Sequence, residues 1–396
     1  MKSGRSSSSW LTSLKPLAGL GKIALGLPVF WAIAIAQPAF ANEQVELRVA
    51  IKEDVSQLKV GSSTNAIVRD DSGQVLGQIA AMDGFSAQVN GGNIAIGNWR
   101  ASRIWIEPTG DGLVWIGDRW YRGRTLLAAT PKGVTAVNYV DLEKYLYSVL
   151  GGEMPPSWPL EALKAQAVAA RSYALHQREK TRNELFDVGD TTAWQVYQGV
   201  EDEYTSTQQA VNETAGQVLA YEGRVIEAVF HSSSGGHTEN VEDIWTQPLP
   251  YLRAVPDFDQ EAPVYQWEKT FTQDELSNRI GGVGTIRSMT PERKTPQGRV
   301  VTMRIIGDAG QKVVSGNALR SALDLRSTLF EVRTLNAGQS KDNAGGVRFQ
   351  ISGRGFGHGL GMSQYGANGL ARRGYNYQQI LLHYYKNASL ARIQVE

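Results

Sequence analysis

The stretch Gly151-Gly152-Glu153-Met154-Pro155-Pro156-Ser157-Trp158-Pro159, followed directly by a run from Leu160 to Ala174, decides how this chain is interpreted. The glycines allow the backbone to come close to a bound ligand, and the prolines stiffen a loop. Pro159 suits the first turn of a helix, and the alanine-rich run after it predicts a closely packed, buried central helix. The stretch therefore places one carboxylate, Glu153, in a tight loop beside a rigid element.

Glu153 is the strongest candidate for catalysis. Met154 and Trp158 offer an apolar wall, and an apolar wall raises the pKa of a carboxylate toward that of a useful general acid. A structural carboxylate that accepts backbone hydrogen bonds in a tight turn fits the pattern equally well. Glu161, at the start of the helix, is interpreted as compensating the helix dipole and not as a second acid.

Composition limits the class of protein. The chain has 396 residues and a formal net charge of +1, which predicts two or three domains and argues against a nucleic acid partner. It has no cysteine, so a disulfide framework and a thiolate nucleophile are excluded. The 42 glycines, 10 tryptophans and 15 tyrosines suit a carbohydrate groove, although core aromatics and turns explain such residues as well.

Residues 1–41 have the features of a signal peptide. Basic residues lie at positions 2, 5, 15 and 22, an apolar segment spans 23–36, and Ala39-Phe40-Ala41 is a small-x-small cleavage site. Asn42 is the predicted mature start. Since no second long apolar run follows, we expect an exported protein in the periplasm, the cell envelope or the medium, with no membrane span after cleavage.

The remaining pattern predicts an α+β fold. Residues 42–140 alternate as short strands and turns, which indicates a β-rich N-terminal lobe. Residues 141–150 form a short helix with Asp141 as its N-cap, and residues 141–396 form a mixed lobe around the alanine-rich helix, with a groove between the lobes. The predicted domains are therefore 1–41, 42–140 and 141–396.

Two glycine-containing segments have some features of known sites, the first of a metal or serine-nucleophile site and the second of a nucleotide-binding loop. His231 and His237 flank a serine-glycine loop, but their spacing matches no familiar zinc pattern, and the loop lacks the elbow of a serine nucleophile. The glycines of 353–361 are not followed by a βαβ unit, so they favour a loop that folds back beside another backbone over a nucleotide site. His358 is either a structural histidine or a substrate contact near Glu153.

Several ordered motifs resemble the SpoIID/LytB family, the group of stage II sporulation protein D and the amidase enhancers. The motifs are Glu153 to Pro159, Ala165 to Arg171, Gln195-Val196-Tyr197, Phe230 to Gly236, and Gly353 to Ala367. The resemblance covers roughly the whole mature chain. It implies a lytic transglycosylase with Glu153 as the catalytic acid, which cleaves the N-acetylmuramic acid–N-acetylglucosamine bond in peptidoglycan glycan strands without stem peptides.

One carboxylate is enough for that reaction. A hydrolytic glycosidase normally needs two carboxylates around the scissile bond. In a lytic transglycosylase the acid protonates the leaving oxygen and then, as a base, takes the proton from the sugar's C6 hydroxyl, which closes a 1,6-anhydro ring. The rival interpretation is a non-catalytic glycan-binding protein that modulates a cell-wall amidase.

The motif positions supply candidate substrate-binding residues, namely Arg171, Gln195, Tyr197, Ser234, Gly235, Gly236, His358, Gln364 and Tyr365. A structural hydrogen bond is an equal alternative for the amide and phenol side chains among them. Some relatives bind zinc through Cys and His just before the Gln-Val-Tyr motif, but residues 189–194 contain neither. We therefore expect no metal and no cofactor.

Overall fold

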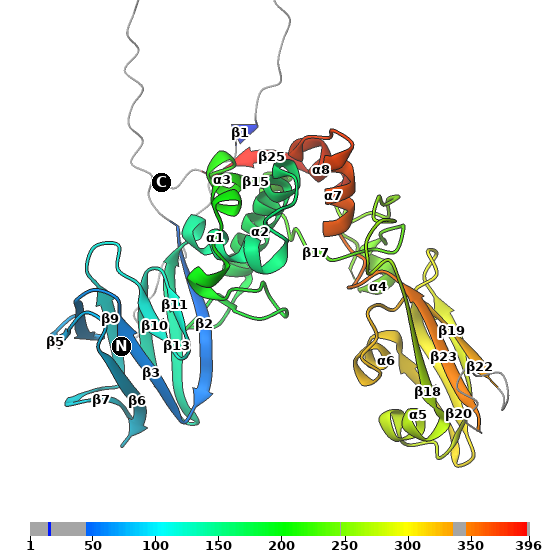
Figure 1. Ribbon diagram of the computed structural model, residues 1–396, viewed down its shortest axis with the longest axis horizontal. Helices are drawn as coiled ribbons and strands as arrows, with labels where there is room; N and C mark the ends of the chain where they lie inside the picture. The colour runs from blue at the N-terminus through cyan, green and yellow to red at the C-terminus, as the bar shows by residue number, and fades with distance from the viewer. Residues whose placement is uncertain (1–14, 17–44, 246, 336–345, 394–396) are drawn as a thin grey trace, which may run out of the picture. The chain divides into compact units, whose positions relative to one another are not determined.

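The computed structural model describes residues 15–16, 45–245, 247–335 and 346–393 (Figure 1). Contacts between Cα atoms divide the chain into two compact units. The first unit contains Met1–Glu153, Ala174–Val225 and Ser389–Glu396, and the second contains Met154–Tyr173 and Ile226–Ala388. The predicted limit between residues 140 and 141 falls inside the first unit. The predicted signal peptide lies outside the described residues, apart from residues 15–16.

The first unit is built on two sheets that pack together, and Val60, Ile94, Ile104 and Leu127 are buried between them. One sheet has the order β14 (Val188–Gly189), β2 (Glu46–Val55), β13 (Gly133–Asp141), β12 (Arg124–Thr130), β9 (Arg103–Pro108), β4 (Ala66–Asp70) and β5 (Val75–Ile79), in which only the β14–β2 pair is parallel. The other has the order β11 (Arg119–Tyr121), β10 (Val114–Ile116), β3 (Gln57–Ser62), β6 (Gly84–Asn90), β7 (Asn93–Ile96) and β8 (Trp99–Ala101).

Helices follow the last long strand of this unit. Strand β13 leads directly into α1 (Leu142–Glu153), and the short helix η1 (Gly199–Asp202) and α3 (Thr205–Glu213) come later. A small sheet has the order β1 (Lys15–Pro16), β25 (Ser389–Arg392), β15 (Gln217–Tyr221) and β16 (Arg224–Val225). Strand β1 belongs to the predicted signal peptide, so cleavage after Ala41 would remove it.

Helix α2 (Leu160–Lys180) is the predicted central helix. Its residues up to Tyr173 belong to the second unit. Ala165, Val168 and Ala169 are completely buried, as are the side chains between them at positions 166 and 167. Because consecutive helical residues point in different directions, the helix is enclosed on all sides over this stretch. Small alanine side chains allow that enclosure.

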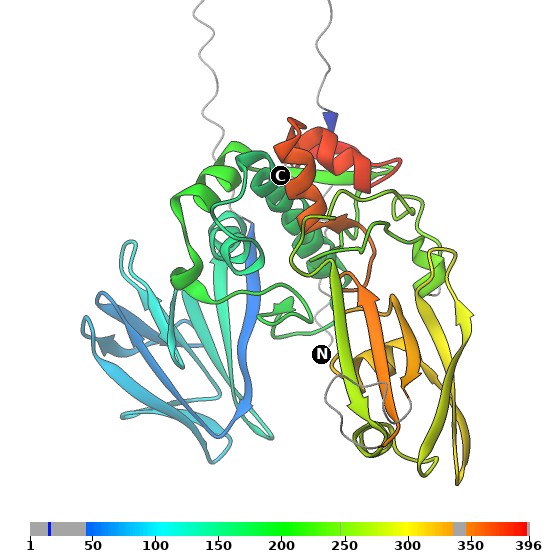
Figure 2. The same ribbon diagram turned by 45° about the vertical axis from the view of Figure 1, so that its right-hand side comes forward.

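The second unit combines two three-stranded antiparallel sheets with short helices (Figures 1 and 2). The sheets have the orders β18 (Gln266–Thr272), β23 (Arg348–Arg354), β22 (Phe330–Leu335) and β19 (Ile286–Lys294), β20 (Val300–Gly307), β21 (Gly310–Ser315). Phe271, Met303, Phe349 and Ile351 belong to their common core. The other elements are α4 (Val241–Ile244), α5 (Gln273–Ile280), α6 (Gly316–Ala322), α7 (Gln364–Arg372), α8 (Tyr377–Tyr384) and the parallel pair β17 (Phe230–His231) and β24 (Met362–Ser363).

The helices and sheets together confirm the α+β class. Among the described residues, no helix is both long enough and apolar enough to cross a membrane.

Candidate functional site

Glu153 is the last residue of α1. The helix begins where the sequence predicts, because the Asp141 carboxylate accepts hydrogen bonds from the backbone N–H groups of Glu143 and Lys144, both at 3.1 Å. Buried Val149 and Leu150 fix its last turns. Glu153 is half-buried, and the Val196 N–H donates to its Oε1 at 2.9 Å. The carboxylate is thus held on a rigid element and oriented by a backbone donor.

The predicted loop before Glu153 is wrong, because Gly151 and Gly152 are helical residues of α1. Neither has a positive φ, so conformational freedom is not the reason for glycine here. A Cβ atom on Gly151 would lie 2.0 Å from the Asp202 carbonyl oxygen, and one on Gly152 would lie 2.9 Å from Val196 Cγ1. The glycines instead let the chain of residues 196–202 pass directly against the helix that carries Glu153.

Gln195 and Tyr197 flank the residue whose N–H bonds Glu153. Gln195 is completely buried, and its Oε1 accepts from the Tyr145 hydroxyl at 3.1 Å. Tyr197 is 2% exposed and donates to Asn138 Oδ1 at 2.8 Å. Both side chains therefore anchor the segment behind Glu153, and their role in binding a sugar stays a prediction.

Asp202 is a second carboxylate that the sequence did not indicate. Its Oδ2 lies 3.2 Å from the position that a Cβ atom on Gly152 would occupy, so it is a close neighbour of the end of α1. Burial raises the pKa of Asp202, and the positive charge of Arg119 opposes the change. No sequence pattern connects position 202 with position 153, because a turn of η1 brings them together.

Met154 and Trp158, the predicted apolar wall, belong to the second unit. Met154 is 1% exposed. The half-buried Trp158 ring meets Tyr365 edge to face, with 4.9 Å between ring centroids. Glu161 accepts from Lys164 Nζ at 2.9 Å and from the Tyr377 N–H at 2.8 Å. Those bonds give Glu161 a structural role in the first turn of α2.

The glycine-rich loop of the second unit folds back beside another backbone, as the sequence predicts. Ser233 and Phe356 exchange backbone hydrogen bonds of 3.0 and 2.7 Å. Gly355 and Gly361 have φ of +75° and +66°, and a Cβ atom on Gly361 would lie 2.1 Å from the Val229 carbonyl oxygen. Only glycine combines this backbone conformation with this approach. His231, at the start of the serine-glycine loop, is the last residue of strand β17.

His358 is held as a neutral imidazole. Its Nε2 donates to the Phe230 carbonyl oxygen at 2.9 Å, and its Nδ1 accepts from the Leu360 N–H at 3.0 Å. Burial lowers the pKa of His358 to about 4, although the bond to Phe230 opposes the change. Burial also places the pKa of His231 well below its ordinary value, and the two rings are 5.0 Å apart.

The serine loop rests on two buried aspartates. Ser234 is completely buried and donates to Asp257, and Ser233 donates to Asp259 at 2.5 Å. Gly235 N–H also donates to Asp259, at 2.8 Å. Burial and the nearby Asp257 carboxylate raise the pKa of Asp259. Since Ser234 is buried and no histidine of the described residues hydrogen-bonds its hydroxyl, the arrangement does not resemble that of a serine nucleophile.

The remaining candidates are largely covered by protein. Arg171 is completely buried, with an Nη1 contact of 3.4 Å to the Ala167 carbonyl oxygen, and Gln364 is 6% exposed. Gly235 is buried, while Gly236 and Tyr365 are half-buried. Of the predicted substrate-binding residues, only Gly236, His358 and Tyr365 are partly exposed. No three His, Asp or Glu side chains of the described residues gather as a metal site would require.

These features define an α+β protein with a helix-borne carboxylate, a Gln-Val-Tyr segment behind it, a serine loop held by two buried aspartates and a glycine-rich loop beside it. The family model described as "Stage II sporulation protein" matches residues 130–221, and one described as a domain of unknown function matches 249–361.

Curated relatives extend this match. The stage II sporulation protein D of Bacillus subtilis is 33% identical over 68% of this chain and 82% of its own length. That of Bacillus amyloliquefaciens is 36% identical over 65% of this chain and 76% of its own length. The amidase enhancer of Bacillus subtilis is 31% identical over 62% of this chain, but only 40% of that protein is covered. The chain therefore belongs to the SpoIID/LytB family.

Proposed function

We propose that this protein is an exported lytic transglycosylase that cleaves peptidoglycan glycan strands, with Glu153 as its single acid and base. The observation that carries the proposal is the placement of Glu153. Glu153 is the last residue of helix α1, whose first turn is capped by Asp141. Its side chain is half-buried, and one of its carboxylate oxygens is oriented by the Val196 N–H. The similarity to sporulation proteins and to an amidase enhancer supports a role at the cell wall.

The proposed reaction begins with protonated Glu153. The acid gives its proton to the glycosidic oxygen as the bond to C1 breaks, and the sugar leaves as an alcohol. The resulting carboxylate then takes the proton of the C6 hydroxyl while that oxygen bonds to C1, so the acid is regenerated. No water is consumed, which explains why a second carboxylate is not required.

Asp202 provides an internal test of this mechanism. In a hydrolytic glycosidase the second carboxylate activates water or forms a covalent intermediate, and its loss would abolish cleavage. Under the one-carboxylate mechanism Asp202→Asn retains cleavage within a few-fold, whereas Glu153→Gln does not. Cleavage abolished equally by both variants, with products that contain an added water, would favour hydrolysis.

The alternative function is a non-catalytic modulator of a cell-wall amidase. One observation favours it, namely the similarity to the amidase enhancer over 62% of this chain. Such a protein would bind glycan strands and stimulate the amidase without cutting them. A Glu153→Gln variant would then stimulate the amidase as well as the unchanged protein.

The deciding experiment incubates the protein starting at Asn42 with glycan strands whose stem peptides have been removed. Mass spectrometry of the products should find 1,6-anhydro ends, which are one water lighter than reducing ends. A folded protein that yields no products, but that binds the strands and stimulates an amidase, would support the modulator instead.

A further inference from the structure

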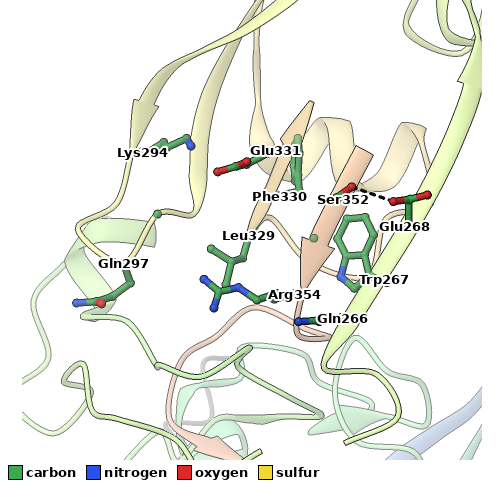
Figure 3. A pocket seen from close by; sticks show the side chains of 12 residues that line it. Gln266, Trp267, Glu268, Lys294, Gln297, Leu329, Phe330, Glu331, Ser352 and Arg354 are labelled. Atoms are coloured by element: carbon green, nitrogen blue, oxygen red, sulfur yellow. Dashed lines mark hydrogen bonds between the residues drawn. The ribbon is translucent and has the colours of Figure 1, made fainter. Parts of the chain in front are cut away.

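A second candidate binding site lies in the second unit, within the matched segment of unknown function. It is a pocket of about 730 Å³, which is within the range of small-ligand sites (Figure 3). Its lining comes from the sheet β18–β23–β22 and from the turn between β19 and β20. The lining residues are Gln266, Trp267, Glu268, Lys294, Gln297, Gly298, Leu329, Phe330, Glu331, Ser352, Gly353 and Arg354.

The strand register places two carboxylates on one face of the sheet. Ser352 of the central strand lies opposite Glu268 on one side and Glu331 on the other. Residues that are directly opposite in an antiparallel sheet project to the same face, and neighbouring strands are about 4.8 Å apart. The two glutamates therefore flank a small serine, whose hydroxyl donates to Glu268 at 3.2 Å.

The next row of the register turns the aromatic rings to the other face. Trp267 and Phe330 lie opposite Gly353. A Cβ atom on Gly353 would be 2.2 Å from the Trp267 ring, so the ring covers this glycine. Phe330 is 2% exposed in the core. Trp267 is half-buried and lines the pocket, so the pocket presents one aromatic ring beside its charged groups.

Charged groups of both signs line the pocket without pairing. Lys294, Glu331 and Arg354 are exposed and make no hydrogen bond or ion pair through their side chains with another of the described residues. Figure 3 shows Lys294 and Gln297 on the hairpin side, across from the strands that carry Glu331, Arg354 and Glu268. Such groups can bind a ligand without first breaking internal contacts.

We propose that this pocket binds a short peptide that carries both a free ammonium group and free carboxylates, as the stem peptides of peptidoglycan do. The glutamates match the ammonium, Lys294 and Arg354 match the carboxylates, and Gln266 and Gln297 can pair with peptide groups. A purely anionic ligand would meet Glu268 and Glu331. The choice of stem peptides as the source rests on the proposed function, and such a site would hold the protein near stretches of wall that still carry peptides.

The test measures binding by calorimetry with three probes. They are a synthetic tetrapeptide stem that contains a diamino acid, the same peptide with its side-chain amine acetylated, and the peptide-free disaccharide of the glycan strand. The tetrapeptide with its free amine should bind, and raising the salt concentration should lower its affinity. Acetylation, or the double change Glu268→Gln with Glu331→Gln, should lower affinity on the order of tenfold. The matched control Glu261→Gln, an exposed carboxylate outside the pocket, should bind the tetrapeptide normally.

The proposal is overturned if the tetrapeptide does not bind, if the disaccharide binds as tightly, or if the double variant keeps full affinity. Cleavage of peptide-free strands is measured on the same preparations. Absent peptide binding with intact cleavage would refute only the pocket. Intact peptide binding by a protein that does not cleave would refute only the transglycosylase, and Glu153→Gln should bind the tetrapeptide normally.

Discussion

Replacing Gly151 by alanine should destabilise the protein, although the same change usually stabilises a helix. Gly151 is helical and has no positive φ, so alanine in an isolated helix would gain about 0.5–1 kcal/mol. The added Cβ atom, however, would lie 2.0 Å from the Asp202 carbonyl oxygen and 2.9 Å from two Tyr204 ring atoms. Since real Cβ contacts essentially never fall below 3.0 Å, the backbone of η1 must retreat by about 1 Å.

Moving the backbone of η1 costs more free energy than alanine gains in helix propensity. Overpacking of this kind costs about 1–3 kcal/mol, which leaves a net loss of about 1–2 kcal/mol in the free energy of unfolding. For a unit of this size that loss lowers the Tm by roughly 2–8 °C. Val196, whose N–H orients Glu153, lies just before η1 in the chain, so a shift of η1 should also disturb Glu153 and lower the rate of cleavage.

Gly152→Ala is the matched comparison. Its Cβ atom would first meet Val196 Cγ1, at 2.9 Å, and a side-chain atom can move at lower cost than backbone. We expect a smaller loss of stability than for Gly151→Ala, measured by urea denaturation and thermal melting of both variants beside the unchanged protein. A Gly151→Ala protein at least as stable as the unchanged one would refute the close approach of η1 to α1.

Three further predictions concern processing, metal and pH. The exported protein should begin at Asn42, and N-terminal sequencing that finds Met1 or Lys2 would reject cleavage after Ala41. Chelators should leave activity unchanged, because residues 189–194 lack Cys and His, and a chelator-sensitive activity restored by zinc would overturn this. The pKa of His358 is lowered to about 4 in the folded protein, so the unfolded chain binds a proton at this histidine more readily than the folded protein does. The free energy of unfolding that results from neutral His358 is therefore fully present above about pH 6.5 and is lost as the pH falls toward 4. Between pH 7 and pH 5 the free energy of unfolding of the unchanged protein should fall by about 2 kcal/mol from this cause, as measured by urea denaturation. The fall should be smaller in His358→Gln, and an equal fall in both proteins would contradict the lowered pKa of His358.

Local patterns predicted much of the framework correctly. Asp141 caps α1, the alanine-rich run forms the buried helix α2, and the glycines of 353–361 fold back beside another backbone. Each of these depends on residues close together in the sequence, or on the steric freedom of glycine. The candidate Glu153 follows from the same short stretch.

Contacts between distant residues could not be predicted in this way. Glycine is a poor helix former, so Gly151 and Gly152 indicated a loop, and only the passage of residues 196–202 explains them within α1. The burial of Gln195 and Tyr197 depends on partners at positions 145 and 138. Asp202 and the pocket around Ser352 likewise depend on turns and strand register that no local motif encodes.

The central claim is that Glu153 alone acts as acid and base, and one measurement tests it most directly. Glu153→Gln keeps the shape of the side chain but cannot donate the proton, and general acid–base catalysis contributes on the order of 10²–10⁴-fold. The rate at which 1,6-anhydro ends form from peptide-free strands should fall by about that factor, in a variant with an unchanged thermal melt that still binds the strands. Full cleavage by a well-folded Glu153→Gln protein would contradict the account.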